Sequence, residues 1–90
     1  MSSKKVNDVT DGTDRFIDWL HLRYSKGAIN MYCMKEDNLV ENQLILCSRN
    51  VMTPHLAKKF YQNLGKILEN YEKKFGPIEV DETPSGILLN

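Results

Sequence analysis

The stretch VMTPHLAKKFYQNLGKILENYEKKFGP, residues 51–77, decides the fold because it carries both ends of one long helix. Thr53 can accept a hydrogen bond from a backbone N–H of the first turn, and Pro54 suits the first helical position because it has no N–H to leave unpaired. Gly76 and Pro77 end the helix, since glycine tolerates the closing conformation and proline cannot continue it. The sequence therefore predicts a helix of about six turns over residues 54–75.

Apolar residues recur within this helix at steps of three and four, which is the pattern of an amphipathic helix. The apolar stripe consists of Ala57, Phe60, Tyr61, Leu64, Ile67, Leu68, Tyr71 and Phe75. The opposite face is polar and includes five lysines: Lys58, Lys59, Lys66, Lys73 and Lys74. One side of the helix is thus expected to pack and the other to face solvent.

Three apolar runs precede the helix: FIDWLHLRYS (16–25), AINMYCMK (28–35) and QLILCSRNVM (43–52). Their length and their aromatic and β-branched content are typical of strands, and the short turn-forming segments between them favour antiparallel neighbours. We therefore predict an α+β fold, with a three-stranded antiparallel meander followed by one long C-terminal amphipathic helix.

A chain of 90 residues holds one domain. Residues 1–14 are polar and are predicted to be a disordered N-terminal arm, residues 15–78 a single α+β domain, and residues 79–90 a flexible acidic tail with an apolar tip. The acids of the tail are Glu79, Asp81 and Glu82, and the tip is Ile87, Leu88 and Leu89. Two outcomes are open for the tip: a frayed end, or docking on a sheet edge or an apolar groove of a partner chain.

Charge and cysteine content limit the class of protein. Twelve basic and twelve acidic residues cancel, so nucleic acid is an unlikely partner for the molecule as a whole. No apolar run approaches the ~20 residues that cross a bilayer, so we expect no membrane partner. Cys33 and Cys47 are interpreted as reduced thiols, and with no apolar N-terminal signal they indicate a cytoplasmic protein.

No catalytic motif is present. Neither His21 nor His55 lies within four residues of a cysteine or a second histidine, and no glycine-rich phosphate loop occurs. A metal site would need a set such as Asp18, His21, Cys33 and Cys47 to converge, and buried thiols with a surface histidine are the simpler interpretation. We expect no metal, no cofactor and no enzymatic activity.

The segment VMTPHLAKKFYQNLGKILENYEKKFGPI also carries a family likeness. It resembles the C-terminal half of the domain of unknown function 3467, a family of small bacterial and archaeal proteins. The resemblance implies an α+β fold without an obvious enzymatic activity. The corresponding positions are Arg49, Val51, Met52, Thr53, Pro54, Ala57, Lys58, Leu64, Asn70, Tyr71, Glu72, Phe75, Gly76 and Ile78. The family's Glu-Phe and Asp-Phe strand pattern is absent, because AINMYCM stands in that place.

Both faces of the predicted strands are apolar, and this pattern indicates self-association. Strand alternation places Leu44 and Leu46 on one face of the third strand, and Ile45, Cys47 and Val51 on the other. One helix cannot cover both faces, so we expect a second copy to do so, since twofold homodimers are the commonest oligomers. The expected protein-interface residues are Leu44, Leu46, Phe60, Leu64, Ile67, Tyr71 and Leu88. The alternative is that the stripe packs only on its own sheet.

Arg49 lies near the end of an apolar strand, beside the start of the helix. Its guanidinium either pairs with Asp18 or Glu72 or, together with Lys58, contacts an anion or a partner. The sequence thus favours a non-enzymatic protein-binding or adaptor module that acts as a homodimer or a larger assembly, with a chaperone-like role as one form of it. The alternative is a weak nucleic-acid-binding protein that uses the basic face of the helix.

Overall fold

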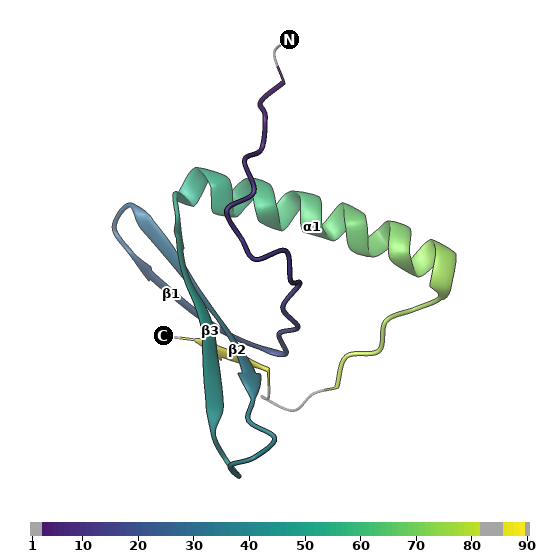
Figure 1. Ribbon diagram of the computed structural model, residues 1–90. Helices are drawn as coiled ribbons and strands as arrows, with labels where there is room; N and C mark the ends of the chain where they lie inside the picture. Colours follow the sequence, from purple (N-terminus) through teal and green to yellow (C-terminus); the bar gives the residue numbers. More distant parts are fainter. Residues whose placement is uncertain (1–2, 82–85, 90) are drawn as a thin grey trace.

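One four-stranded sheet and one helix make up the fold (Figure 1). The computed structural model describes residues 3–81 and 86–89. The elements are β1 (Trp19–Ser25), β2 (Ala28–Glu36), β3 (Leu44–Met52), α1 (Pro54–Phe75) and β4 (Ile87–Leu89). The strands lie in the order β3-β2-β1-β4, with β1, β2 and β3 antiparallel and β4 parallel to β1. The α+β class is therefore confirmed, and the sheet is mixed rather than purely antiparallel.

The two turns of the meander depend on local residues. Gly27 closes the β1–β2 turn with φ +84°, a conformation that suits glycine. In the β2–β3 loop, the Asp37 carboxylate accepts the backbone N–H groups of Leu39 and Val40 at 2.8 and 3.2 Å. The same carboxylate also accepts the side-chain amide of Gln43 at 3.1 Å. These bonds satisfy the loop backbone and keep β2 and β3 in register.

β1 is shorter at its start than the sequence indicates. Phe16 is 82% exposed and lies outside any strand. Pairing begins at Asp18, whose N–H donates to the carbonyl of Met34 at 3.1 Å. Phe16 and Ile17 therefore precede the strand, although the sequence predicts that the strand includes them.

A β-bulge in β3 changes which side chains share a face. Cys33 pairs with Ser48 but Met34 pairs with Leu46, so Cys47 is an extra residue between them. Side chains alternate along a strand, and one extra residue reverses the alternation beyond it. Val51 consequently lies on the face of Leu44 and Leu46, and the prediction that it shares a face with Ile45 is wrong.

α1 begins and ends where the sequence predicts. The Thr53 hydroxyl accepts the N–H of Leu56 at 3.1 Å, and the N–H of Gly76 donates to the carbonyl of Glu72 at 2.9 Å. Gly76 has φ +100°, which explains the glycine at this end. Figure 1 shows α1 running away from the end of β3, so that its C-terminal end lies far from the strands. No residue of α1 is buried.

β4 is the element that the predicted meander lacks. Ile87–Leu89 pair with Leu20–Leu22 of β1, and the N–H of Leu20 donates to the carbonyl of Gly86 at 2.8 Å. The apolar tip thus docks on a sheet edge, and the edge belongs to its own chain rather than to a partner. Residues 82–85, including Glu82, lie outside the described residues, as does Asn90.

The apolar core is very small. Among the described residues, only Cys33 and Met34 are buried hydrophobic side chains. The chain exposes 8606 Å², whereas a compact monomer of 10.4 kDa exposes about 5,400 Å². Its radius of gyration is 15.8 Å, against about 12 Å for a compact domain of this length. Exposed residues 3–18 contribute part of this excess surface and α1 another part.

Candidate interaction surfaces

The strand register defines two faces of the sheet. The aliphatic face carries Leu20, Leu22, Tyr24, Ile29, Met31, Cys33, Ser48, Asn50, Met52, Ile87 and Leu89. The aromatic face carries Trp19, His21, Arg23, Asn30, Tyr32, Met34, Glu36, Leu44, Leu46, Arg49, Val51 and Leu88. The first face is mainly hydrophobic, and the second combines aromatic rings with charged groups.

The stripe of α1 is a second apolar surface, and much of it is exposed. The exposed fraction of its side chains is 45% for Phe60, 39% for Leu64, 63% for Ile67 and 51% for Tyr71. The rings of Tyr71 and Phe75 lie 4.9 Å apart and fix the C-terminal end of the stripe. The alternative that the stripe packs only on its own sheet does not match these exposures.

The predicted interface residues fall on two separate surfaces. Phe60, Leu64, Ile67 and Tyr71 share α1. Leu44, Leu46 and Leu88 lie instead on the aromatic face of the sheet: Leu44 and Leu46 on one edge strand, β3, and Leu88 on the other, β4. Leu46 and Leu88 are 42% and 41% exposed, so a partner could reach both.

Arg49 lies in a cross-strand row with two aromatic rings. Its guanidinium carbon is 5.4 Å from the centre of the Tyr32 ring, within the range of a cation–π contact. The His21 ring packs edge-on against Tyr32 at 5.7 Å, and the Asn30 amide donates to the Tyr32 hydroxyl at 3.0 Å. These contacts orient Arg49 over the aromatic face.

Arg49 pairs with neither Asp18 nor Glu72, the two carboxylates that the sequence suggests as its partners. Asp18 accepts the N–H of Glu36 at 3.1 Å, and Glu72 accepts the N–H of Ile78 at 3.0 Å. Within residues 3–81 and 86–89, no acidic group forms an ion pair with Arg49. The guanidinium therefore presents its donors to solvent, as an anion or partner contact would require.

Lys58, the other predicted anion contact, lies on a different surface. It lines a shallow depression of about 460 Å³ on α1, together with Pro54, His55, Lys59 and Gln62. The structure does not bring Lys58 and Arg49 into one cavity.

A larger cavity, of about 590 Å³, lies beside the β2–β3 loop. Its lining is Trp19, Glu36, Asp37, Glu41, Asn42, Gln43, Leu44 and Leu88. The Trp19 indole N–H donates to the Glu36 carboxylate at 3.3 Å. The sequence alone does not reveal this cavity, because its lining brings the β2–β3 loop together with Leu88 of β4, whose pairing partner is distant in the sequence.

The candidate metal ligands do not converge. Cys33 lies on the aliphatic face and His21 on the aromatic face. Both Cys33 and Cys47 are free thiols, and in the described part of the chain no group of three or more histidine, cysteine or acidic side chains is arranged to hold a metal ion. In the same part of the chain, no helix is long and apolar enough to cross a membrane.

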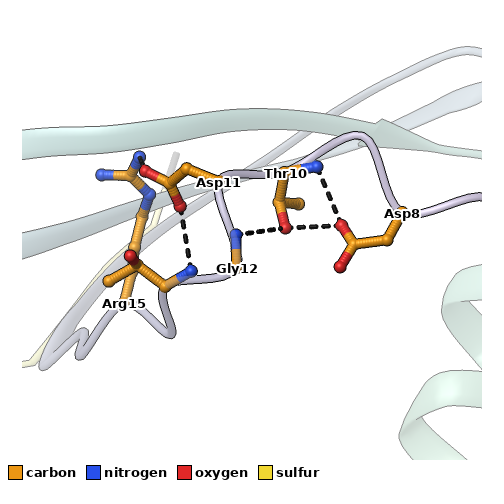
Figure 2. Close-up of polar contacts among 6 residues, drawn as sticks. Asp8, Thr10, Asp11, Gly12 and Arg15 are labelled. Atoms are coloured by element: carbon orange, nitrogen blue, oxygen red, sulfur yellow. Dashed lines mark hydrogen bonds and ion pairs between the residues drawn. The ribbon is translucent and has the colours of Figure 1, made fainter.

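Residues 3–18 contain no strand or helix. Figure 2 shows the local turns of this segment, in which Asp8 and Asp11 accept hydrogen bonds from nearby residues. The side chain and then the backbone N–H of Thr10 bond to Asp8 and lower the pKa of its carboxyl group. The backbone N–H of Thr13 does the same for the pKa of Asp11, which also lies 3.9 Å from Arg15. All these groups are exposed, so they shape the arm without anchoring it.

No protein-family model matches this sequence, and neither a curated protein nor a solved structure matches it. The resemblance to the domain of unknown function 3467 therefore stays a prediction. The candidate surfaces rest on the geometry of this chain alone.

Proposed function

We propose that this protein is a non-enzymatic protein-binding module that works as a homodimer or a larger assembly. The observation that carries the proposal is α1, a 22-residue helix with an apolar stripe and no buried residue. Burial of such a stripe is favourable by about 25 cal/mol per Å² of apolar surface that is removed from water. A complex in which a partner covers the stripe would therefore be stabilised.

A second copy is the partner that the surface area favours. The chain exposes about 3,200 Å² more than a compact monomer of its mass. Burying half of that excess on each of two copies would match the interfaces of obligate homodimers, about 2,000–5,000 Å² in total. Two identical stripes can also meet across a twofold axis, where one patch serves both chains. The two free thiols fit a cytoplasmic location.

Weak nucleic-acid binding through the lysine face of α1 is the less favoured function. The acidic and basic residues cancel over the whole chain, so no long-range attraction adds to these five lysines. Binding of labelled DNA at physiological salt would then be weak and steeply salt-dependent.

A pair of charge substitutions on α1 tests self-association. Leu64→Glu places a carboxylate in the stripe, and burial of an unpaired charge should raise the dissociation constant of the dimer at least about tenfold. Lys66→Glu, on the opposite face of the same helix, should leave it almost unchanged. Sedimentation equilibrium gives both constants, and circular dichroism checks whether each variant retains the helix. Equal constants for the two variants would remove the stripe from the interface.

A further inference from the structure

The outer edge of β3 is unpaired, although residues 13–16 line a cavity together with Ile45, Leu46 and Cys47 at its first half. β3 lies at one end of the sheet order, and no strand among the described residues pairs with its outer side. An edge strand offers backbone N–H and C=O groups to any extended chain that lies alongside it. Lysine, proline, other charged residues and bulges all protect such edges; β3 contains no lysine or proline, and its protection is limited to Arg49 and the bulge at Cys47. Its bulge at Cys47 interrupts the edge but leaves residues 48–52 regular.

The side chains of this edge would select a particular peptide. Leu46, Arg49 and Val51 of β3 lie on the aromatic face, and the apolar pair is 42% and 68% exposed. A strand added beside β3 directs every second side chain to the same face, next to these residues. Arg49 is held over Tyr32 and has no acidic partner in the described chain. A carboxylate on the added strand would therefore pair with Arg49, and apolar side chains would pack beside Leu46 and Val51.

We propose that the outer edge of β3 binds an extended peptide that has an acidic side chain opposite Arg49 and an apolar side chain two positions away on each side. The peptide becomes a fifth strand of the sheet. This inference rests on the proposed protein-binding function, but it uses a surface different from the stripe of α1.

Two other occupants fit this edge less well. Antiparallel pairing of β3 with the β3 of a second copy, around an axis near Arg49, would bring two guanidinium groups together, and like charges across strands are destabilising. A nucleic-acid base would need a free ring on which to stack. The Tyr32 ring already contacts Arg49 on its face and His21 from the side.

Fluorescence polarisation with a fluorescein-labelled peptide, Thr-Val-Thr-Glu-Thr-Val-Thr, tests the proposal on the full chain. The unmodified protein should bind this peptide, and Arg49→Glu should bind it at least about tenfold more weakly, because a charged hydrogen bond is lost and a repulsion is added. The same peptide with lysine at the centre should show the reverse order for the two proteins. Lys66→Glu serves as the charge-matched control and should bind like the unmodified protein. N-methylation of alternate peptide nitrogens should abolish binding, since it removes strand hydrogen bonds.

Several results would overturn the inference. The unmodified protein could fail to bind the glutamate peptide, or could bind the lysine peptide equally well. A labelled single-stranded DNA could compete with the peptide and bind at Arg49 with higher affinity. Alternatively, Arg49→Glu could convert a dimer to a monomer, which would show that the edge pairs with a second copy. Loss of peptide binding in a chain that still dimerises would refute only the edge site, whereas peptide binding by a monomer would refute only the self-association. A cooperative thermal denaturation transition of Arg49→Glu would establish that the variant is folded.

Discussion

Met34 shows how much depends on single residues in this chain. Met34 and Cys33, on opposite faces of β2, are the two buried hydrophobic side chains among the described residues, and Met34 lies at the bulge that sets the register of β3. A domain with so little buried surface has little stability to lose. Substitutions at these two positions should therefore have larger effects than elsewhere in the sheet.

We expect Met34→Ala to lower the free energy of unfolding by about 2–4 kcal/mol, since it removes buried methylene groups and leaves a cavity. Leu39→Ala is the control, because Leu39 is 95% exposed in the β2–β3 loop and its truncation should cost less than about 0.5 kcal/mol. Urea denaturation followed by circular dichroism measures both changes. A similar loss of unfolding free energy for the two variants would show that the burial of Met34 does not stabilise the fold.

The face on which Val51 lies could not be predicted from the residues of β3 alone. Simple alternation along β3 predicts that Val51 lies on the face of Ile45, and the bulge makes this prediction wrong. A bulge depends on the partner strand, and the sequence of β3 has no glycine to mark one. Arg49 stays a predicted anion or partner contact, and the sequence could not show that Tyr32 of β2 would be its neighbour.

At the scale of elements, the helix was predictable because its signals are local. Thr53 and Pro54 at the start, Gly76 at the end and the apolar period between them all lie in one continuous segment. The meander was predictable from its short turns. β4 was not, because three apolar residues near a chain end form a strand only when β1 offers an edge, and that pairing is distant in sequence.

Deletion of residues 84–90 tests the role of β4 as an element. The deletion removes the Gly86 carbonyl that accepts the N–H of Leu20 and exposes that edge of β1. Hydrogen exchange of the Leu20 amide should accelerate at least about tenfold, whereas amides paired between β2 and β3 should change little. The freed edge should also bind extended chains more readily. Unchanged exchange at Leu20 would show that β4 does not protect this edge in solution.

At the scale of the whole molecule, the arrangement of the helix is the decisive feature. The sequence predicted a wide apolar stripe, and its width alone allowed packing on the chain's own sheet. In the structure the stripe is exposed and the accessible surface is 8606 Å². The direction in which α1 leaves β3 depends on the whole arrangement of the chain, so the helical pattern could not reveal it.

The molar mass of the unmodified chain in solution tests the central claim most directly. Light scattering after size-exclusion chromatography, over a range of micromolar concentrations, should give a mass of at least twice 10.4 kDa. This mass would follow from the burial of the α1 stripe between copies. A constant mass of 10.4 kDa across the whole range would contradict self-association and leave the exposed stripe without its proposed role.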